Sequence, residues 1–322
     1  MLMPTRIQLK YGLMLGANVV LFYFLYRWIE SSIHWDAFKA AIVDTPFTAI
    51  LSALIIGQII LCLYGQRLAL LIDRDFGSSF WIVCYGFGAN SVLPFRIGDA
   101  LKIYFAKRYF NVSAARLLFI KVMEKFFDLT FLLVIGVLAF LFGVIAVDKT
   151  PLILITGFLV AIILFTIAAI VVIRHESNWI SRFRKHGTID HIFNMFEDAI
   201  VNPAKKKAIG ISAIIWVSTV TMMYLFYILA LPGFEIGWND ALALVFVTTI
   251  SLGIPSAPGA LGIFEAAIVF YLTKFVGVTP DKSLATALVL HLLIAGPQIV
   301  LMLTAIVIAR QKLGKSRRLS TL

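Results

Sequence analysis

The chain is organised as long apolar runs separated by shorter polar segments. A helix that crosses a bilayer needs about 20 mostly apolar residues. Six runs are long enough and are predicted to be full crossings: 11–29, 46–65, 126–147, 152–173, 208–231 and 284–309. The pattern therefore predicts an all-α polytopic membrane protein, with residues 1–322 forming a single transmembrane domain.

Two further apolar stretches are interrupted, and we predict that they are re-entrant broken hairpins. Residues 76–95 carry no charge, yet the segments on both sides must be cytosolic if the six crossings are to alternate. Residues 241–276 are broken near their middle by prolines and glycines, namely Pro255, Pro258, Gly259 and Gly262. We expect hairpins over 76–110 and 241–276; two short, tilted crossings are the alternative.

Composition agrees with a lipid environment. Hydrophobic residues make up 61% of the chain and charged residues 14%, whereas soluble domains have about 45–50% and 25%. These values exclude an ordinary soluble domain, a disordered chain and a disulfide scaffold. Cys62 and Cys84 both lie in apolar runs and are expected to be small buried side chains.

The distribution of Lys and Arg predicts the orientation. Basic residues gather in the N-terminal tail and in 96–128, 174–207 and 310–322, whereas 30–45 and 232–240 are acidic. Because basic loops stay on the cytosolic side, we expect both termini in the cytosol and the protein in the cell inner membrane. The net charge of +11 then reflects topology and a preference for anionic lipids, and nucleic acid is not needed as a partner.

The order of the predicted elements repeats along the chain. Span, span, broken hairpin and span follow one another in 1–147 and again in 152–309. One half begins inside and the other outside, which is typical of the inverted repeats of secondary transporters. The basic, aromatic-containing segment 174–207 is predicted to be an amphipathic helix on the inner leaflet, and 310–322 a cytosolic tail.

The first candidate binding segment is the break between Asn90 and Lys102. Pro94 removes a backbone donor, so a helix is expected to break there. Arg96 beside the break is suited to bind a phosphate with its planar guanidinium, Lys102 adds a second positive charge, and Asp99 is expected to orient Arg96. An ordinary cytosolic loop is the alternative interpretation.

Glu124 and Asp128 form the second candidate site. They are four residues apart and therefore share one helix face, where two like charges need a cation nearby. Arg96, Lys102 or Lys121 are the candidate cations. An acid that leads into a long apolar run, such as Asp128, is a functional candidate by default, although a carboxylate at a helix N-terminus is the alternative.

The third candidate site is the break in the second hairpin, from Pro255 to Glu265. Backbone groups freed by Pro258, Gly259 and Gly262, together with the helix that follows, are suited to an anion. Glu265 is the only acid of this hairpin and implies either a coupling proton or a basic partner, Arg96 or Lys274. His291 and Gln298 are expected to form helix–helix hydrogen bonds.

Motifs of soluble enzymes are weak or absent. Asp73-Arg74-Asp75 has the Asp-x-Asp form of glycosyltransferases, but no nucleotide-binding domain surrounds it. The chain has no phosphate-binding loop, no His-Glu-x-x-His helix and no cysteine pair at metal spacing. We therefore expect no enzyme activity, no cofactor and no metal.

The three candidate segments together resemble the lysylphosphatidylglycerol synthase/flippase transmembrane-region family. That family shows Asn…Leu-Pro-x-Arg-x-Gly-Glu-x-x-Arg, then Glu-Arg-x-x-Asp, then Pro-x-x-Pro-Gly-x-x-Gly-x-x-Glu. The matching positions here are Asn90, Leu93, Pro94, Arg96, Gly98, Asp99, Lys102, Glu124, Lys125, Asp128, Pro255, Pro258, Gly259, Gly262 and Glu265. Asp99, Lys102 and Lys125 replace Glu, Arg and Arg; the charges are kept, but Lys102 loses bidentate phosphate binding.

The resemblance implies a flippase that moves a phospholipid, an aminoacylated phospholipid or a polyprenyl-phosphate-linked glycolipid between leaflets. The substrate-binding residues would be Asn90, Pro94, Arg96, Asp99, Lys102, Pro258, Gly259 and Gly262; Glu124, Asp128 and Glu265 would tune charge or carry a proton. The soluble lysyl-transfer domain of the two-part members is not expected. Alternatives are an accessory subunit that binds a membrane-associated glycosyltransferase or lipid synthase through 174–207, and a small-solute secondary transporter. The oligomeric state stays open.

Overall fold

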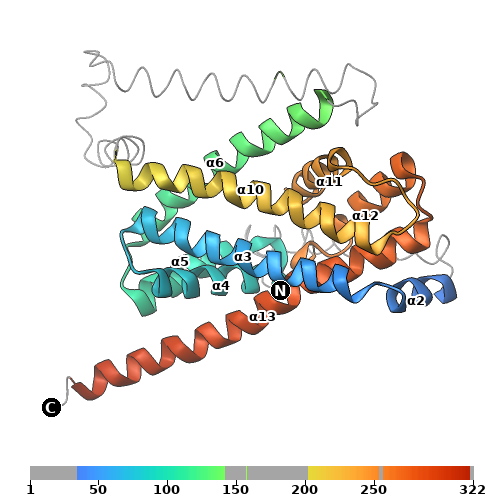
Figure 1. Cartoon of the computed structure of the whole chain (residues 1–322). Coiled ribbons are helices and arrows are strands. Elements are labelled where there is room, and N and C mark those ends of the chain that lie inside the picture. Colours follow the sequence, from blue (N-terminus) through green and yellow to red (C-terminus); the bar gives the residue numbers. More distant parts are fainter. Residues whose placement is uncertain (1–34, 142–156, 158–201, 254–256, 320–322) are drawn as a thin grey trace, which may run out of the picture.

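The computed structural model of the protein describes residues 35–141, 157, 202–253 and 257–319, and this part of the chain is helical and contains no strand (Figure 1). Three short elements, η1 (Pro94–Arg96), η2 (Pro258–Ala260) and the π-helix η3 (Leu272–Val276), interrupt or extend the α-helices. The α-helices are α2 (Trp35–Val43), α3 (Phe47–Ile72), α4 (Phe76–Val92), α5 (Gly98–Phe110), α6 (Ala114–Leu141), α10 (Pro203–Ala230), α11 (Trp238–Ser251), α12 (Ile263–Tyr271) and α13 (Pro280–Leu319).

Four helical stretches in the described residues are long and apolar enough to cross a membrane: Phe47–Ile72, Lys206–Ala230, Pro258–Val276 and Pro280–Gln311. Three of them cover the predicted runs 46–65, 208–231 and 284–309 to within one residue, and α6 contains most of 126–147. The predicted crossing 11–29, nearly all of 152–173 and most of the segment 174–207 lie outside the described residues.

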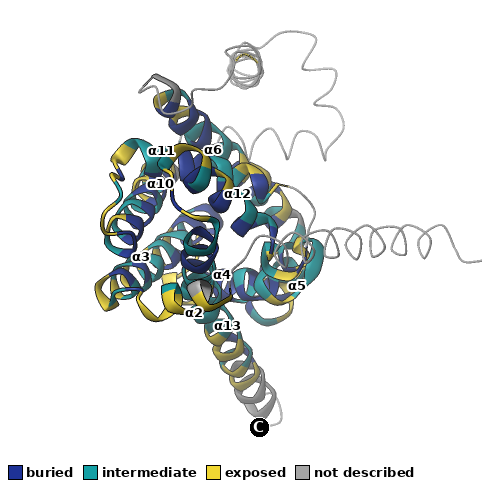
Figure 2. Cartoon of the chain, turned by 90° about the vertical axis from the view of Figure 1, so that its right-hand side faces the viewer, coloured by how far each residue is buried: buried dark blue, intermediate teal, exposed yellow. Residues whose placement is uncertain are grey.

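The two long apolar helices α3 and α10 pack along each other, and α4 packs along α13. Small residues permit the close approach, as in other membrane helix pairs. A Cβ atom at Gly88 of α4 would lie 2.4 Å from the Gln298 carbonyl oxygen and from Met302 Cβ of α13. Seen from the end of the bundle (Figure 2), buried positions face the neighbouring helices and exposed positions lie on the outer faces.

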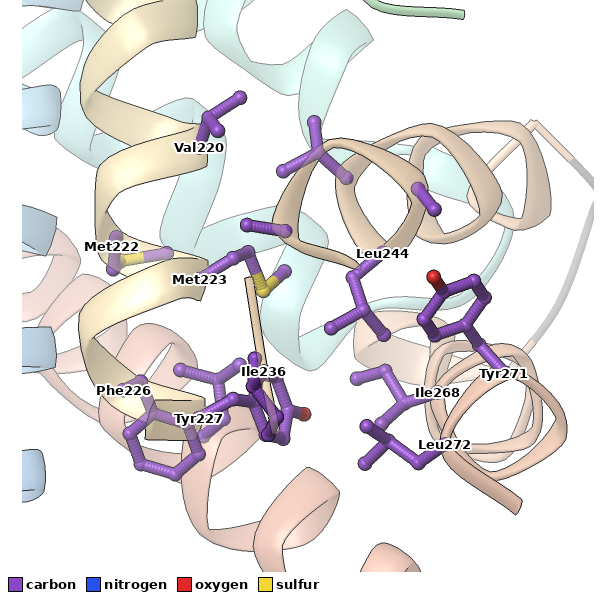
Figure 3. Packing of buried hydrophobic residues seen from close by; sticks show 14 of the residues in the cluster. Val220, Met222, Met223, Phe226, Tyr227, Ile236, Leu244, Ile268, Tyr271 and Leu272 are labelled. Carbon is purple, nitrogen blue, oxygen red and sulfur yellow. The ribbon is translucent and has the colours of Figure 1, made fainter. Parts of the chain in front are cut away.

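Two buried apolar clusters hold the helices together. One joins α10, α11 and α12 through residues such as Met223, Tyr227, Leu244 and Ile268 (Figure 3). The other joins α3, α4, α5 and α6 and includes Cys84. Cys62 corrects a prediction: its side chain is exposed, because it lies on a face of α3 that no described helix covers. In lipid, such clusters stabilise by close packing more than by removal of apolar surface from water.

Both predicted hairpins are helix–break–helix units with the same backbone at the break. In α4–η1–α5, Pro94 is followed by Phe95 and Arg96 with φ of 58° and 54°. In α11–η2–α12, Pro258 is followed by Gly259 and Ala260 with φ of 66° and 60°. Such left-handed conformations are uncommon outside glycine, so their recurrence after each proline indicates that the two breaks are equivalent.

Each hairpin returns to the end of the bundle from which it starts. Arg74, before α4, donates a 3.5 Å hydrogen bond to the Asn111 carbonyl after α5. Asp240, at the start of α11, accepts a 2.8 Å bond from the Tyr271 hydroxyl at the end of α12.

The two hairpins start from opposite ends of the bundle and meet inside it. Arg67 near the end of α3 bonds Ser212 near the start of α10, so these two helices are antiparallel. The first hairpin follows the end of α3 and the second follows the end of α10. Their breaks, η1 and η2, contact each other, and Figure 1 shows the two pairs of helices at opposite ends.

Candidate functional site

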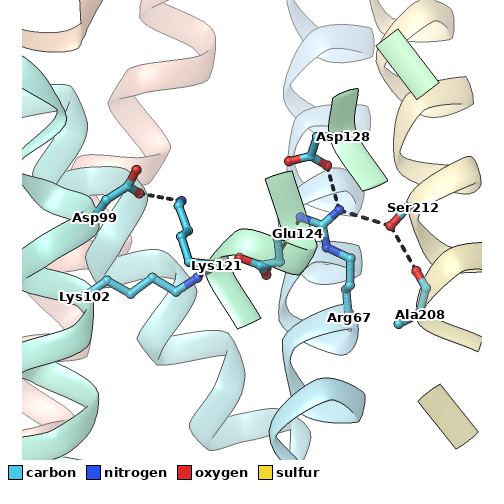
Figure 4. Close-up of polar contacts among 8 residues, drawn as sticks. All are labelled: Arg67, Asp99, Lys102, Lys121, Glu124, Asp128, Ala208 and Ser212. Carbon is cyan, nitrogen blue, oxygen red and sulfur yellow. Dashed lines mark hydrogen bonds and ion pairs between the residues drawn. The ribbon is translucent and has the colours of Figure 1, made fainter. Parts of the chain in front are cut away.

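A buried arginine on α3 is the centre of the candidate site. Arg67 is 1% exposed, and its NH1 atom donates to Asp128 Oδ1 at 2.7 Å and to Ser212 Oγ at 3.1 Å. Its NH2 atom lies 3.8 Å from Glu124 Oε1. A buried charge is tolerated only when it is paired and hydrogen-bonded, so Arg67 fixes α3, α6 and α10 relative to one another (Figure 4).

The first hairpin is attached to α6 by two further ion pairs. Lys102 Nζ of α5 lies 3.7 Å from Glu124 Oε2, and Lys121 Nζ of α6 lies 2.7 Å from Asp99 Oδ1 of α5. Asn90 Nδ2 of α4 also donates to Asp99 Oδ1 at 3.3 Å. We call Arg67, Asp99, Lys102, Lys121, Glu124 and Asp128 the ion-pair network; its members carry three charges of each sign.

Two glycines bring the network side chains of the first hairpin together. A Cβ atom at Gly86 would lie 3.0 Å from Lys102 Cβ. A Cβ atom at Gly98 would lie 2.5 Å from the Asn90 backbone nitrogen and from Asn90 Oδ1. The two limbs therefore pack so closely that Asn90 reaches Asp99 and Lys102 lies flat on α4.

Exposure changes along the network. The side chains of Lys121 and Asp99 are 28% and 32% exposed, that of Lys102 is 12% exposed and that of Arg67 is 1% exposed. Burial alone would raise the pKa of Asp99, but Lys121, with smaller contributions from Lys102 and Lys125, outweighs burial and lowers this pKa. The accessible end of the network is therefore an ionised Asp99 that Lys121 holds.

Several expectations for these residues are corrected. Asp99 does not orient Arg96, because it binds Lys121 and Asn90 instead. Arg96 and Lys102 have different partners. Glu124 and Asp128 are not at a helix N-terminus, because α6 begins at Ala114. Lys102, a candidate cation for this pair of acids, does pair with Glu124.

Arg96 joins the two hairpins. Its side chain is exposed, and NH1 donates at 3.2 Å to the carbonyl of Leu252, just beyond α11. Ser91, at the end of α4, donates to Gln298 Oε1 of α13 at 3.0 Å. The tips of both hairpins and the middle of α13 therefore meet, and Gln298 makes the expected helix–helix bond.

At the tip of the second hairpin, Glu265 caps its own helix. Its Oε2 atom accepts from the Gly262 backbone N–H at 2.6 Å, and its Oε1 atom lies 2.5 Å from His291 Nδ1 of α13. The expected pairing of Glu265 with Arg96 or Lys274 is therefore wrong. His291 makes the expected contact between helices, and its partner is the acid Glu265.

Arg67 and Ser212 are absent from the sequence-based site. The expected crossing 46–65 stops two residues before Arg67, whereas α3 continues to Ile72. The signal was an arginine surrounded by apolar residues in a run longer than a crossing needs, which marks a functional candidate. The described residues contain no cluster of three or more His, Cys, Asp or Glu side chains suited to a metal ion.

The fold and site define a helical membrane protein with a charged, hairpin-lined interior. The family model described as the lysylphosphatidylglycerol synthase TM region matches residues 11–301. The chain therefore belongs to this family. A comparison with curated proteins gave no match.

Proposed function

We propose that the chain is a lipid translocase, and not an enzyme, that moves the phosphate-bearing headgroup of a membrane lipid between leaflets. The candidate lipids are phospholipids, including aminoacylated ones, and polyprenyl-phosphate-linked glycolipids. Membership of a family whose members handle lipids supports the class of function. The observation that carries the proposal is the ion-pair network beside two hairpin tips that meet within the bundle.

The network supplies exchangeable partners for a phosphate. A charge is costly in hydrocarbon, so a headgroup needs polar partners along its path. A lipid phosphate that approaches the accessible end would replace Asp99 on Lys121, and then Glu124 on Lys102. The displaced carboxylates of Asp99 and Glu124 are suited to bind an ammonium group where the lipid headgroup carries one.

The network also has unused hydrogen-bonding capacity. Arg67 Nε and Asn90 Oδ1 are buried and have no hydrogen-bond partner among the described residues. Buried polar atoms without a partner are rare in folded proteins. A donor and an acceptor of this kind beside the ion pairs are consistent with a site that takes a polar ligand or water.

The repeated break supports an inverted-repeat architecture, with six full crossings and two re-entrant hairpins in the cytoplasmic membrane and both termini in the cytosol. In this arrangement Pro94, Pro258, Gly259 and Gly262 shape the two tips, as discontinuous helices do at transporter midplanes. Arg96 holds the tips together through the Leu252 carbonyl. Its release would open a path, and the freed guanidinium would be available to the phosphate.

The test is transport of labelled lipid by the purified protein in liposomes. Phospholipids with a fluorescent headgroup, and in a second arm a labelled polyprenyl phosphate, are followed by quenching from outside. Lys121→Ala should slow transport about tenfold or more, because one charge-assisted contact of about 1.5–3 kcal/mol is lost. Arg96→Ala should also slow it.

Arg116→Ala is the matched control, because the Arg116–Asp73 ion pair is at the surface, away from the network. It should transport at the wild-type rate. If the wild-type protein moves neither lipid, or if Lys121→Ala and Arg96→Ala move lipid as fast as the control, the proposed translocase is wrong. Native mass spectrometry of lipid that stays bound to the purified protein shows whether the substrate is a phospholipid or a polyprenyl phosphate.

A further inference from the structure

The pair Glu265–His291 differs in kind from the ion-pair network. In the network, each acid is paired with Arg or Lys, which stay positive over the physiological pH range. Glu265 is instead paired with His291, the side chain whose charge changes between about pH 5 and pH 8. The acid at the tip of the second hairpin is therefore not paired with a permanently charged Lys or Arg.

The contacts of the pair leave one ring nitrogen, Nε2, away from the carboxylate. Both oxygens of Glu265 are occupied, by the Gly262 N–H and by His291 Nδ1, and the Glu265 side chain is 3% exposed. An ionised carboxylate only accepts hydrogen bonds, so an ionised Glu265 requires the proton on Nδ1 and leaves the lone pair on Nε2. His291 Nε2 makes no hydrogen bond to any described residue.

His291 Nε2 faces the place where the hairpins meet. A Cβ atom at Gly259 would lie 3.6 Å from His291 Nε2 and 3.1 Å from the Ser91 carbonyl oxygen. The ring edge packs against Phe264, with ring centroids 5.0 Å apart. The His291 side chain is 13% exposed, so the ring lies at the edge of the junction and is not sealed within the core.

We propose that Glu265 and His291 form the proton-binding pair of the translocase, and that one proton moves with each anionic headgroup. Nε2 takes up a proton from the water at one membrane face, and the pair changes from a net charge of −1 to zero. A phosphate then enters the junction without meeting an uncompensated carboxylate. When the phosphate leaves, Nε2 releases the same proton on the other side. This inference rests on the proposed lipid transport.

The other charged and titratable groups around the pair do not compensate Glu265. On α10, the buried Tyr227 hydroxyl interacts electrostatically with Glu265 and has no described hydrogen-bond partner. On α11, Asp240 accepts from Tyr271 at the far end of α12. Lys274 of η3 lies beyond that end, and Lys282 near the start of α13 lies over the Phe234 ring. Arg96 of η1 binds the Leu252 carbonyl.

The decisive variants keep the size of the two side chains close to the original and remove the proton-binding group or the charge of the pair. His291→Asn retains an amide N–H where Nδ1 donates to Glu265 but cannot be protonated, and Glu265→Gln removes the charge. Tyr271→Phe is the matched control, because it breaks a hydrogen bond of the same hairpin away from the tip. Each protein is placed in liposomes with labelled anionic phospholipid, with and without a pH gradient, at zero membrane potential.

With wild type and Tyr271→Phe, the gradient should shift the leaflet ratio of the lipid by up to about tenfold per pH unit, the limit for one proton per lipid. With Glu265→Gln, the ratio should stay near one whatever the gradient, because no carboxylate is left to be compensated. With His291→Asn, lipid exchange itself should be slowed and should not respond to the gradient, because the Glu265 carboxylate stays uncompensated. Wild-type transport that ignores the gradient, or a His291→Asn protein that still responds to it, would overturn the proton-binding pair but leave lipid transport intact.

A second measurement does not depend on transport. The chain has five histidines, so the protonation of His291 can be followed by nuclear magnetic resonance of histidine-labelled protein. The response of His291 to pH should differ between the wild type and Glu265→Gln, because the ring loses its carboxylate contact. An identical response in the two proteins overturns the pair, whether or not the wild-type protein transports lipid.

Discussion

At the scale of single residues, the main feature is that charge is buried in apolar helices but is locally balanced. Arg67 has Asp128 at 2.7 Å and Glu124 at 3.8 Å, and a third contact comes from the Ser212 hydroxyl. Such a group adds little net stability compared with apolar residues of the same shape, but removing one partner is costly. The network is therefore expected to be sensitive to single substitutions.

Replacing Arg67 by Met should destabilise the protein by about 3–5 kcal/mol, because Asp128 and Glu124 are left without their buried cation. The free energy of unfolding can be measured by denaturant titration in detergent. The double variant Arg67→Met with Asp128→Leu should recover part of this loss. If Arg67→Met alone is as stable as the wild type, the ion pairs do not hold α3 against α6.

The sequence identified most of the charged residues of the site but, apart from Lys102 as a cation for Glu124, not their partners. Asp99, Lys102, Glu124 and Asp128 stood out because charge is rare in apolar surroundings. Pairing depends on how α3, α5 and α6 are placed, and local spacing does not determine this. Arg96 and Asp99 are three residues apart, yet the left-handed backbone at Phe95 and Arg96 directs them to different partners.

At the scale of elements, the two breaks and the α4–α13 contact determine where the hairpin tips lie. Proline and glycine positions predicted both breaks correctly, because these residues act locally on the backbone. Helix lengths were less predictable: α3 and α6 both extend past the apolar runs, because a charged residue ends an apolar run without ending the helix. The short helix α2, which packs against α13, was not predicted.

Gly88→Ala should separate α4 from α13. Its new Cβ atom would lie 2.4 Å from the Gln298 carbonyl oxygen and Met302 Cβ, and overpacking of this kind costs about 1–3 kcal/mol. Gly210→Ala is the control, because nothing lies within 4 Å of a Cβ atom there. Thermal unfolding should show a lower midpoint for Gly88→Ala alone; equal midpoints would contradict the tight contact.

At the scale of the whole molecule, the two hairpins start from opposite ends of an antiparallel helix pair and have equivalent breaks. If the bundle lies across a membrane as proposed, the ends of the hairpins are on opposite sides. Lys107, in the last turn of α5, and Lys274, in η3, are both exposed and report these two ends.

In a protein whose Cys62 and Cys84 are replaced by Ser, single cysteines at these positions can be labelled with a membrane-impermeant maleimide. Lys107→Cys should react only from the cytosolic side and Lys274→Cys only from the outside. Arg74→Cys, before the first hairpin, should react from the same side as Lys107→Cys, because a re-entrant hairpin returns to its starting face. Opposite labelling of positions 74 and 107 would mean that α4 or α5 crosses completely, and equal labelling of 107 and 274 would exclude the inverted arrangement.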